Sequence, residues 1–345
     1  MDLMILDDTL TPIDIVDNAT SVIWNKRYFE AGDFEIYISS NEKTAESLKK
    51  RYFVMRQDDD MICMITHVEY KDDPENGNFK IVSGQSVEAL LKRRIVWQQT
   101  SSKSSETVEQ FIRRLIDENA INPTDTKRKI PFLELGELKG FAEKLDKQLT
   151  GDNLLDAIVE LCKAYEYGFK ITLENKKLKF ELYKGIDRSY NQSTLPFVTF
   201  SDAYDNLIDS QYIYDENDAK NVALVAGEGE GLDRRTASVG EASGIDRQEI
   251  FVDARDISSN NGEVTESDYI AQLQEKGKEN IVSYEETFES TIESQTNYIY
   301  KKDWNLGDIV NHENTSWNLF VTPRIVEVLE CEDENGHSVI PTFQQ

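Results

Sequence analysis

Strand-like alternation of apolar and polar residues at both ends of the chain constrains the fold more than any other feature of the sequence. Phe34, Ile36 and Ile38 occupy every second position of one run, which is the pattern of a strand that is buried on one face. Similar runs fill most of residues 1–98 and return from about residue 197 almost to the last residue. The sequence therefore predicts a mostly β protein.

Helical spacing replaces this alternation in the middle of the chain. The apolar residues of segment 105–120 recur at steps of three and one, which places them on one face of a helix, and segment 154–162 repeats the pattern. Two strand-like runs at 169–173 and 178–183 follow, separated by a short polar turn. We expect a small α+β unit here, between β-rich flanks.

Two short stretches near opposite ends of the chain resemble each other. Residues 67–70 read His-Val-Glu-Tyr and lead to Glu-Asn-Gly at 75–77, whereas residues 325–328 read Ile-Val-Glu-Val and lead to Glu-Asn-Gly at 334–336. Asn-Gly accepts positive φ angles and is typical of a hairpin turn. The similarity fits two related β-barrel domains on either side of the central unit.

Charge and composition limit what the chain can bind. A net charge of −27 repels nucleic acid and anionic lipid at long range. The 15 Tyr and 15 Phe side chains supply enough apolar surface to argue against disorder. The start of the chain lacks the basic and apolar regions of a signal peptide, and no apolar run reaches the roughly 18 residues of a membrane span. We expect synthesis in a cytoplasm.

The motifs that most resemble chemical sites have simpler explanations. Segment 227–231 reads Gly-Glu-Gly-Glu-Gly, but Glu228 and Glu230 would repel a phosphate, so a turn is the better interpretation. Asp58, Asp59 and Asp60 are consecutive, and we interpret them as a solvated turn and not as a metal site. The three cysteines form no Cys-x-x-Cys pair, and the sequence contains neither His-Glu-x-x-His nor Gly-x-Ser-x-Gly. We expect no catalytic residue, no metal and no cofactor.

Several segments, in chain order, carry a family resemblance. They are Ala31–Glu35, Leu178–Arg188, Val198–Leu207, Lys220–Gly231 with Arg234 and Arg235, Leu306–Val310 and Thr322–Ile325. In these segments the chain resembles the tail-hub family of siphoviruses and prophages, the Gp37-like siphovirus tail proteins, whose fold is like that of the N-terminal region of tail-associated proteins. The resemblance covers nearly the whole chain.

The resemblance implies a baseplate-hub-like architecture of the α+β class that is mostly β. We expect an N-terminal β-barrel hub domain at 1–98, a central small α+β domain at 99–196, and a second β-barrel hub domain at 197–345 with a polar insertion at about 232–280. Three such subunits would form a ring in which six related barrels face the tail tube.

Ten positions are expected to be structural signature residues of the family. We interpret the glycines among them as turn formers, and the Asp and Arg residues as hydrogen-bonding fasteners near strand ends. They are Asp187, Arg188, Asn206, Leu207, Gly227, Gly229, Gly231, Gly307, Asp308 and Arg324.

The function implied by the resemblance is structural and not enzymatic. The chain would form a homotrimeric hub ring at the tail tip of a virion, connect the tail tube to the host-recognition apparatus, and line the DNA path. Its partners would be further copies of itself, distal tail and tail-tube proteins, and receptor-binding or tape-measure proteins, without sequence-specific binding to nucleic acid. The alternative is a tail-associated cell-wall hydrolase or saccharide-binding module, and a bacterial host cytoplasm would be the place of synthesis in either case.

Overall fold

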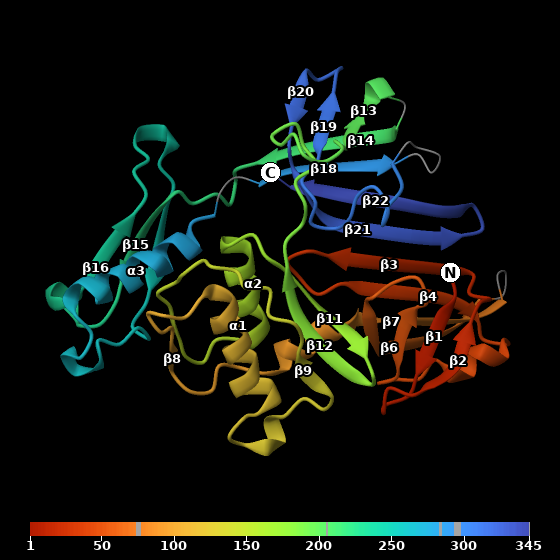
Figure 1. The fold of residues 1–345 in the computed structure, drawn as a ribbon, viewed down its shortest axis with the longest axis horizontal. Coiled ribbons are helices and arrows are strands. Elements are labelled where there is room, and N and C mark those ends of the chain that lie inside the picture. Colours follow the sequence, from red (N-terminus) through yellow and green to blue (C-terminus); the bar gives the residue numbers. More distant parts are fainter. Residues whose placement is uncertain (74–76, 205, 283–284, 293–297, 345) are drawn as a thin grey trace.

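One eleven-stranded sheet joins the two ends of the chain (Figure 1). The structure is a computed structural model that describes residues 1–73, 77–204, 206–282, 285–292 and 298–344. The strands of this sheet are, in spatial order, β14 (Leu207–Asp215), β18 (Glu285–Ile292), β22 (Gly336–Gln344), β21 (Arg324–Asp333), β3 (Ser21–Arg27), β4 (Asp33–Ser39), β7 (Gly77–Ser86), β6 (Ile62–Asp73), β5 (Phe53–Arg56), β1 (Leu3–Leu6) and β2 (Pro12–Val16). The prediction of a mostly β chain with some helices is confirmed.

The expected pair of closed barrels is not confirmed. Strand β3 is hydrogen-bonded to β4 on one side and to β21 on the other, so the N-terminal strands continue into the C-terminal strands instead of closing on themselves. The outer strands β14 and β2 are not paired with each other, and the described residues form no closed barrel. The two similar stretches are both antiparallel hairpins, β6–β7 and β21–β22. The first hairpin's expected turn at Glu75 and Asn76 lies outside the described residues.

The central unit contains two helices and a hairpin. Helix α1 (Val108–Ile116) begins at Thr107, which forms a capping box with Gln110, and it continues into a π-helical turn at Asp117–Ile121. Helix α2 (Leu154–Ala164), expected from the apolar stripe at 154–162, has Asn153 as its N-cap, because the Asn153 side chain accepts hydrogen bonds from two backbone amides of the first turn.

Small sheets and short helices complete the architecture. The sheets are β10 (Gln148–Leu149) with β8 (Thr100–Ser101), β11 (Gly168–Glu174) with β12 (Lys177–Tyr183) and β9 (Leu133–Leu135), β13 (Thr199–Ser201) with β19 (Asn311–Asn314) and β20 (Leu319–Val321), and β16 (Thr236–Val239) with β15 (Val222–Ala226) and β17 (Glu249–Asp253). The short 3₁₀ helices are Lys43–Ser47, Val87–Arg93, Thr126–Arg128, Asp202–Tyr204, Gly231–Asp233, Gly244–Asp246 and Asn260–Gly262. No described helix is both long and apolar enough to cross a bilayer.

The central unit shares its core with the N-terminal strands. Phe53 and Ile62 of the large sheet belong to the same buried cluster as Phe111 of α1 and Ile158 of α2. The opposite face of the N-terminal strands forms a second cluster, which contains Phe34 and its alternating neighbours as predicted. The expected divisions at residues 98 and 196 stay predictions, although the shared core ties the first two units together.

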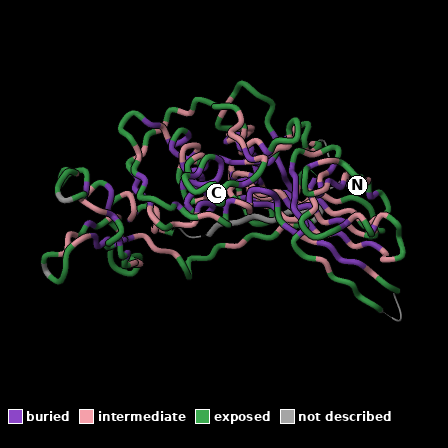
Figure 2. Tube along the Cα trace, turned by 90° about the horizontal axis from the view of Figure 1, so that it is seen from below, coloured by how far each residue is buried: buried purple, intermediate pink, exposed green. Residues whose placement is uncertain are grey.

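Residues 222–281 form a separate lobe that includes the whole of the polar insertion expected at about 232–280. Helix α3 (Glu266–Asn280) packs on β15, β16 and β17, and Tyr269 and Leu273 of this helix join Val225 and Val252 in a small core of their own. Figure 2 shows this lobe at one end of the molecule, with short buried stretches inside a largely exposed outline. The lobe is thus a folded unit, because its few apolar residues pack together against one face of α3.

The buried imidazole of His312 should make stability depend on pH. It lies on β19 against the Phe343 ring, and burial, opposed only in part by Asp202, lowers the pKa of His312 to about 4. In the unfolded chain this histidine has its ordinary pKa of about 6.5, so below that pH it binds a proton that the folded chain does not bind. The folded state is therefore most stable above about pH 6.5, and its stability falls as the pH drops. We expect a loss of about 2 kcal/mol in unfolding free energy between about pH 7.5 and about pH 5.

Urea unfolding of His312→Gln at both pH values checks this expectation. The variant should lose most of the pH dependence, whereas His67→Gln, which changes a histidine whose side chain is 60% exposed, should keep it. An unchanged slope in His312→Gln would contradict the assignment.

Candidate functional site

The turn between β5 and β6 fastens three parts of the chain together. It carries Asp58, Asp59 and Asp60, the three consecutive aspartates that the sequence suggested to be solvated. That interpretation is wrong for Asp59, whose side chain is 0% exposed. Their carboxylates instead face lysine side chains from distant segments, and we call this set of ion pairs the aspartate junction.

Asp59 binds one lysine from each end of the chain. Lys26 of β3 donates to Asp59 Oδ1 at 3.0 Å, and Lys301, which precedes the C-terminal strands, lies 2.7 Å from Asp59 Oδ2. The backbone amide of Met61 also donates to Asp59 Oδ1 at 2.8 Å, which fixes the carboxylate in the turn. A single buried carboxylate therefore links two lysines that are 275 positions apart in the sequence (301 − 26).

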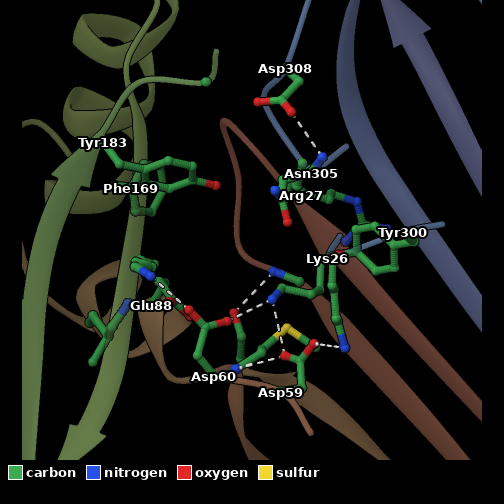
Figure 3. Close-up of a pocket in the computed structure, with 18 of the residues that line it drawn as sticks. Lys26, Arg27, Asp59, Asp60, Glu88, Phe169, Tyr183, Tyr300, Asn305 and Asp308 are labelled. Atoms are coloured by element: carbon green, nitrogen blue, oxygen red, sulfur yellow. Dashed lines mark hydrogen bonds and ion pairs between the residues drawn. The ribbon is translucent and has the colours of Figure 1, made fainter. Parts of the chain in front are cut away.

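Asp60 extends the junction to the central unit. Lys26 donates to Asp60 Oδ1 at 2.7 Å, and Lys170 of β11 donates to Asp60 Oδ2 at 2.7 Å. Figure 3 shows Lys26 between Asp59 and Asp60, with the strands of the central unit on one side and the C-terminal segment on the other. The turn thus holds the N-terminal, central and C-terminal segments at one point.

A second buried pair continues the network on β21. Arg56 of β5 lies 2.8 Å from Glu330 Oε1, and both side chains are buried. Arg56 also donates to both carboxylate oxygens of Asp58, at 2.9 and 2.6 Å. Glu330 Oε2 lies 3.2 Å from His337 Nε2, so the pair reaches the last strand, β22.

The protonation states of the junction follow from these contacts. Burial alone would raise the pKa of Asp60, but the charges of Lys26 and Lys170 outweigh it and hold that pKa below its ordinary value. Burial likewise opposes the charge of Lys26, yet Asp59 and Asp60 raise the pKa of this lysine. At Glu330, His337, Arg56 and Lys301 together overcome burial and lower the pKa to about 2. Lys26, Asp60 and Glu330 are therefore charged at neutral pH.

A cavity of about 670 Å³ adjoins the junction. Its lining includes Lys26, Asp60, Lys170 and Lys301. Asp60 is already paired with Lys26 and Lys170, and Lys301 is paired with Asp59. Within the described residues, no three His, Cys, Asp or Glu side chains are grouped as metal ligands. The arrangement is better suited to holding strands together than to catalysing the reaction of a substrate.

Five of the ten expected signature residues meet beside this cavity. The Arg188 side chain donates to Asp308 Oδ2 at 2.9 Å, while Asp308 Oδ1 accepts from the backbone amide of Ile186 at 2.8 Å. Arg324 donates to the Gly307 carbonyl at 2.8 Å. The fifth residue, Asp187, accepts from a nearby backbone amide and lies beside Ile309 in an isolated β-bridge. These contacts agree with fastening near strand ends, and their status as family signature stays a prediction.

Gly307 is constrained by both its backbone and its neighbour. Its φ of +93° disfavours any residue with a side chain, and a Cβ atom there would lie 2.3 Å from the Tyr28 ring. Arg324 stacks over the same ring, 5.3 Å from its centroid. The close approach of backbone to Tyr28 therefore requires glycine at this position.

The other signature residues lie elsewhere. The Asn206 amide donates to the Thr199 carbonyl and accepts from the Ser201 amide, which fixes the start of β14, and Leu207 packs against the C-terminal core. The three remaining glycines are in the lobe, where Gly229 and Gly231 have positive φ as turn formers should. Gly227 does not have a positive φ. Glycine is required at this position because the backbone packs closely against the Tyr269 hydroxyl, and not because of a turn.

Sequence reasoning missed the aspartate junction entirely. Its members are spread over more than 300 residues and stand in no common motif. The only local signal is the run of three aspartates before the apolar strand β6, and that signal does not identify the lysines that neutralise them.

Comparisons with known proteins agree on one class. The family model described as Siphovirus ReqiPepy6 Gp37-like protein matches residues 2–343. A tail protein from Neisseria meningitidis shares the fold with a TM-score of 0.60 and 11% identity, over 100% of this chain and 96% of that one. The 43 kDa tail protein of prophage MuSo2 from Shewanella oneidensis has a TM-score of 0.59 and 11% identity, with 99% and 98% covered. Prophage tail protein gp18 from Listeria monocytogenes has a TM-score of 0.55 and 14% identity, with 100% and 94% covered. No curated protein sequence matches.

Removal of the central charge of the junction should destabilise the whole chain. In Asp59→Asn, Lys26 still pairs with Asp60, and Lys301 keeps only its longer contacts with Asp58 and Glu330, so the loss of the buried carboxylate's charge-assisted contacts should cost about 1.5–3 kcal/mol. We expect the unfolding free energy to fall by that amount, measured by urea titration at neutral pH.

Asp218→Asn is the matched control, because it removes the same charge from an exposed turn and should change stability by less than about 0.5 kcal/mol. Equal effects of the two substitutions would show that the junction does not hold the fold.

Proposed function

Because this chain belongs to the Siphovirus ReqiPepy6 Gp37-like protein family, we propose that it is a structural protein of the tail tip, where it forms a hub ring between the tail tube and the host-recognition apparatus. The observation that carries this proposal is the match of the fold to prophage tail proteins from end to end. Because the match covers both chains from end to end, this chain and the prophage tail proteins share the arrangement of all their parts, and not only the fold of one domain.

The aspartate junction supports a structural role for the chain. It fixes the N-terminal strands, the central unit and the C-terminal strands to one another with paired charges instead of leaving them on flexible linkers. A ring that connects two other assemblies needs subunits whose parts keep a constant arrangement. A polar network of this kind also specifies which strands meet, which is a documented use of buried charge.

Two related units in each subunit support a trimeric ring. The hairpins β6–β7 and β21–β22 lie in one continuous sheet, on opposite sides of the β3–β21 pairing. Three subunits with two such units each would present six similar surfaces to a sixfold tail tube. The domain boundaries at 98 and 196 belong to this proposal, and the two similar units in it are hairpins of one sheet, since the described residues form no closed barrel.

The acidic excess suits a path for DNA. Carboxylates that face the lumen of a ring would repel passing phosphates and keep DNA from adhering to the wall. The partners in this arrangement are distal tail and tail-tube proteins on one side, and receptor-binding or tape-measure proteins on the other. The proposed location is the tail tip of the virion.

A homotrimer is the expected state in solution at sufficient concentration. Its acidic subunits repel one another, so association should strengthen as salt rises from about 0.05 to about 0.5 M, over which the screening length shortens about threefold. Light scattering at several protein and salt concentrations measures this. A stable twofold dimer, or association that weakens steadily with salt, would contradict the proposed ring.

Hydrolysis of cell walls is the competing function, and the site geometry gives it little support. The Asp60 and Glu330 carboxylates of the junction are held ionised by lysine and arginine partners, whereas a general acid needs a raised pKa. We expect no release of soluble sugar or peptide from peptidoglycan of several bacterial hosts. Measurable turnover that disappears when one carboxylate is replaced would establish the enzyme instead.

A further inference from the structure

Another cavity lies on the central unit, and it shares no lining residue with the cavity beside the aspartate junction. Its volume is about 360 Å³, and it is formed by the segment before β8 and by residues 118–128 after α1. We call it the Trp97 cavity, after the aromatic residue in its wall. Ligand pockets occupy about 300–1,000 Å³, so this one has room for a small ligand or for one or two rings of a polymer.

Trp97 is held in place and yet is exposed. Its backbone amide donates to the Asn119 side chain at 3.0 Å, and the Arg128 guanidinium stacks on its ring, 4.9 Å from the centroid. Arg128 is itself fixed by a hydrogen bond of 2.6 Å to the Ile95 carbonyl. Since the Trp97 residue keeps 64% exposure although Arg128 covers one face, the other face of the indole is open to solvent.

The turn that shapes the cavity departs from regular helix geometry. After α1 the chain forms a π-helical turn at Asp117–Ile121, a rare conformation that is frequent at functional sites. Asn119 in this turn is 3% exposed, and its amide donates to the Leu115 carbonyl while its oxygen receives the Trp97 amide. The π turn thus positions Trp97 and places Glu118 and Asn122 in the cavity wall.

The polar groups around Trp97 suit an uncharged ligand with many hydroxyls. The wall offers the Gln98 amide and the Thr124 hydroxyl, together with the oxygen of the Asn122 amide, whose nitrogen already donates to Asp117 at 2.7 Å. The Thr100 hydroxyl also lines the wall, but it is buried and donates to the Gln98 carbonyl at 3.0 Å. A flat, open indole face beside such groups can stack against the C–H face of a sugar ring, because an aromatic side chain combines apolar surface with defined geometry.

A nucleotide fits these features less well. It could stack on Trp97, but the cavity wall also carries Glu118 and Asp125, and the chain has a net charge of −27, which together oppose a phosphate. An apolar peptide would leave the polar wall without partners. We propose that the Trp97 cavity binds a pyranose ring of an uncharged polysaccharide, stacked on Trp97 and hydrogen-bonded to Asn122 and the neighbouring amides and hydroxyls.

This binding activity goes beyond the hub role and does not depend on ring formation. A trimer that binds no sugar would leave the hub proposal intact, and a monomer that binds sugar would leave this one intact.

The test is isothermal titration of the full chain with glucose, galactose, rhamnose, N-acetylglucosamine and maltose, and with adenosine monophosphate as the competing class. At least one sugar should bind with a Kd in the millimolar range or below, detectable at about 10 mM ligand. Trp97→Ala should weaken that binding at least tenfold, Asn122→Ala severalfold, and Trp97→Tyr less than Trp97→Ala because it keeps an aromatic face.

The control is Trp317→Ala, which removes another exposed tryptophan, 47% exposed, and should leave the affinity unchanged. Thermal unfolding of each variant verifies that the fold is retained. The proposal is overturned if none of the sugars binds, if Trp97→Ala and Trp317→Ala have equal effects, or if adenosine monophosphate binds at Trp97 more tightly than every sugar.

Discussion

The ion pairs of the Asp58–Asp60 turn are the constraint on which the rest of this structure depends. Strands from the two ends of the chain pair along β3 and β21, but backbone hydrogen bonds alone do not specify which strands should meet. The buried carboxylate of Asp59 supplies that specificity, because it can pair with Lys301 only when the C-terminal segment lies beside the turn between β5 and β6. Asp60 fixes the central unit to the same turn, because it pairs with Lys170 of β11.

Local patterns in the sequence predicted local structure well. Alternation around Phe34 identified a strand buried on one face, and the apolar stripes identified α1 and α2, because each pattern is imposed by a single element and its nearest layer. The lobe was underestimated, since its core is formed by few apolar residues that converge only in three dimensions. The junction could not be predicted, because the free energy of a buried aspartate depends on lysines that the sequence separates by hundreds of residues.

The architecture is the basis for the proposed role of this chain as a connector. One sheet runs through both ends of the chain, the central unit shares its core with that sheet, and the lobe extends from one end (Figure 1). Ion pairs fasten distant segments, as Arg188 and Asp308 do, and the fold agrees with that of prophage tail proteins along its whole length. The Trp97 cavity stands apart from this framework, as a recognition site on a structural protein would.

The most direct test of the hub account is an electron cryomicroscopy reconstruction of intact tails that contain this protein. The account predicts one threefold ring at the end of the tail tube, with three copies of the chain, two similar units of each copy facing the tube, and an acidic lumen along the DNA path. Density for the chain in every ring of the tail shaft, in a peripheral fibre, or nowhere in the finished tail would contradict it.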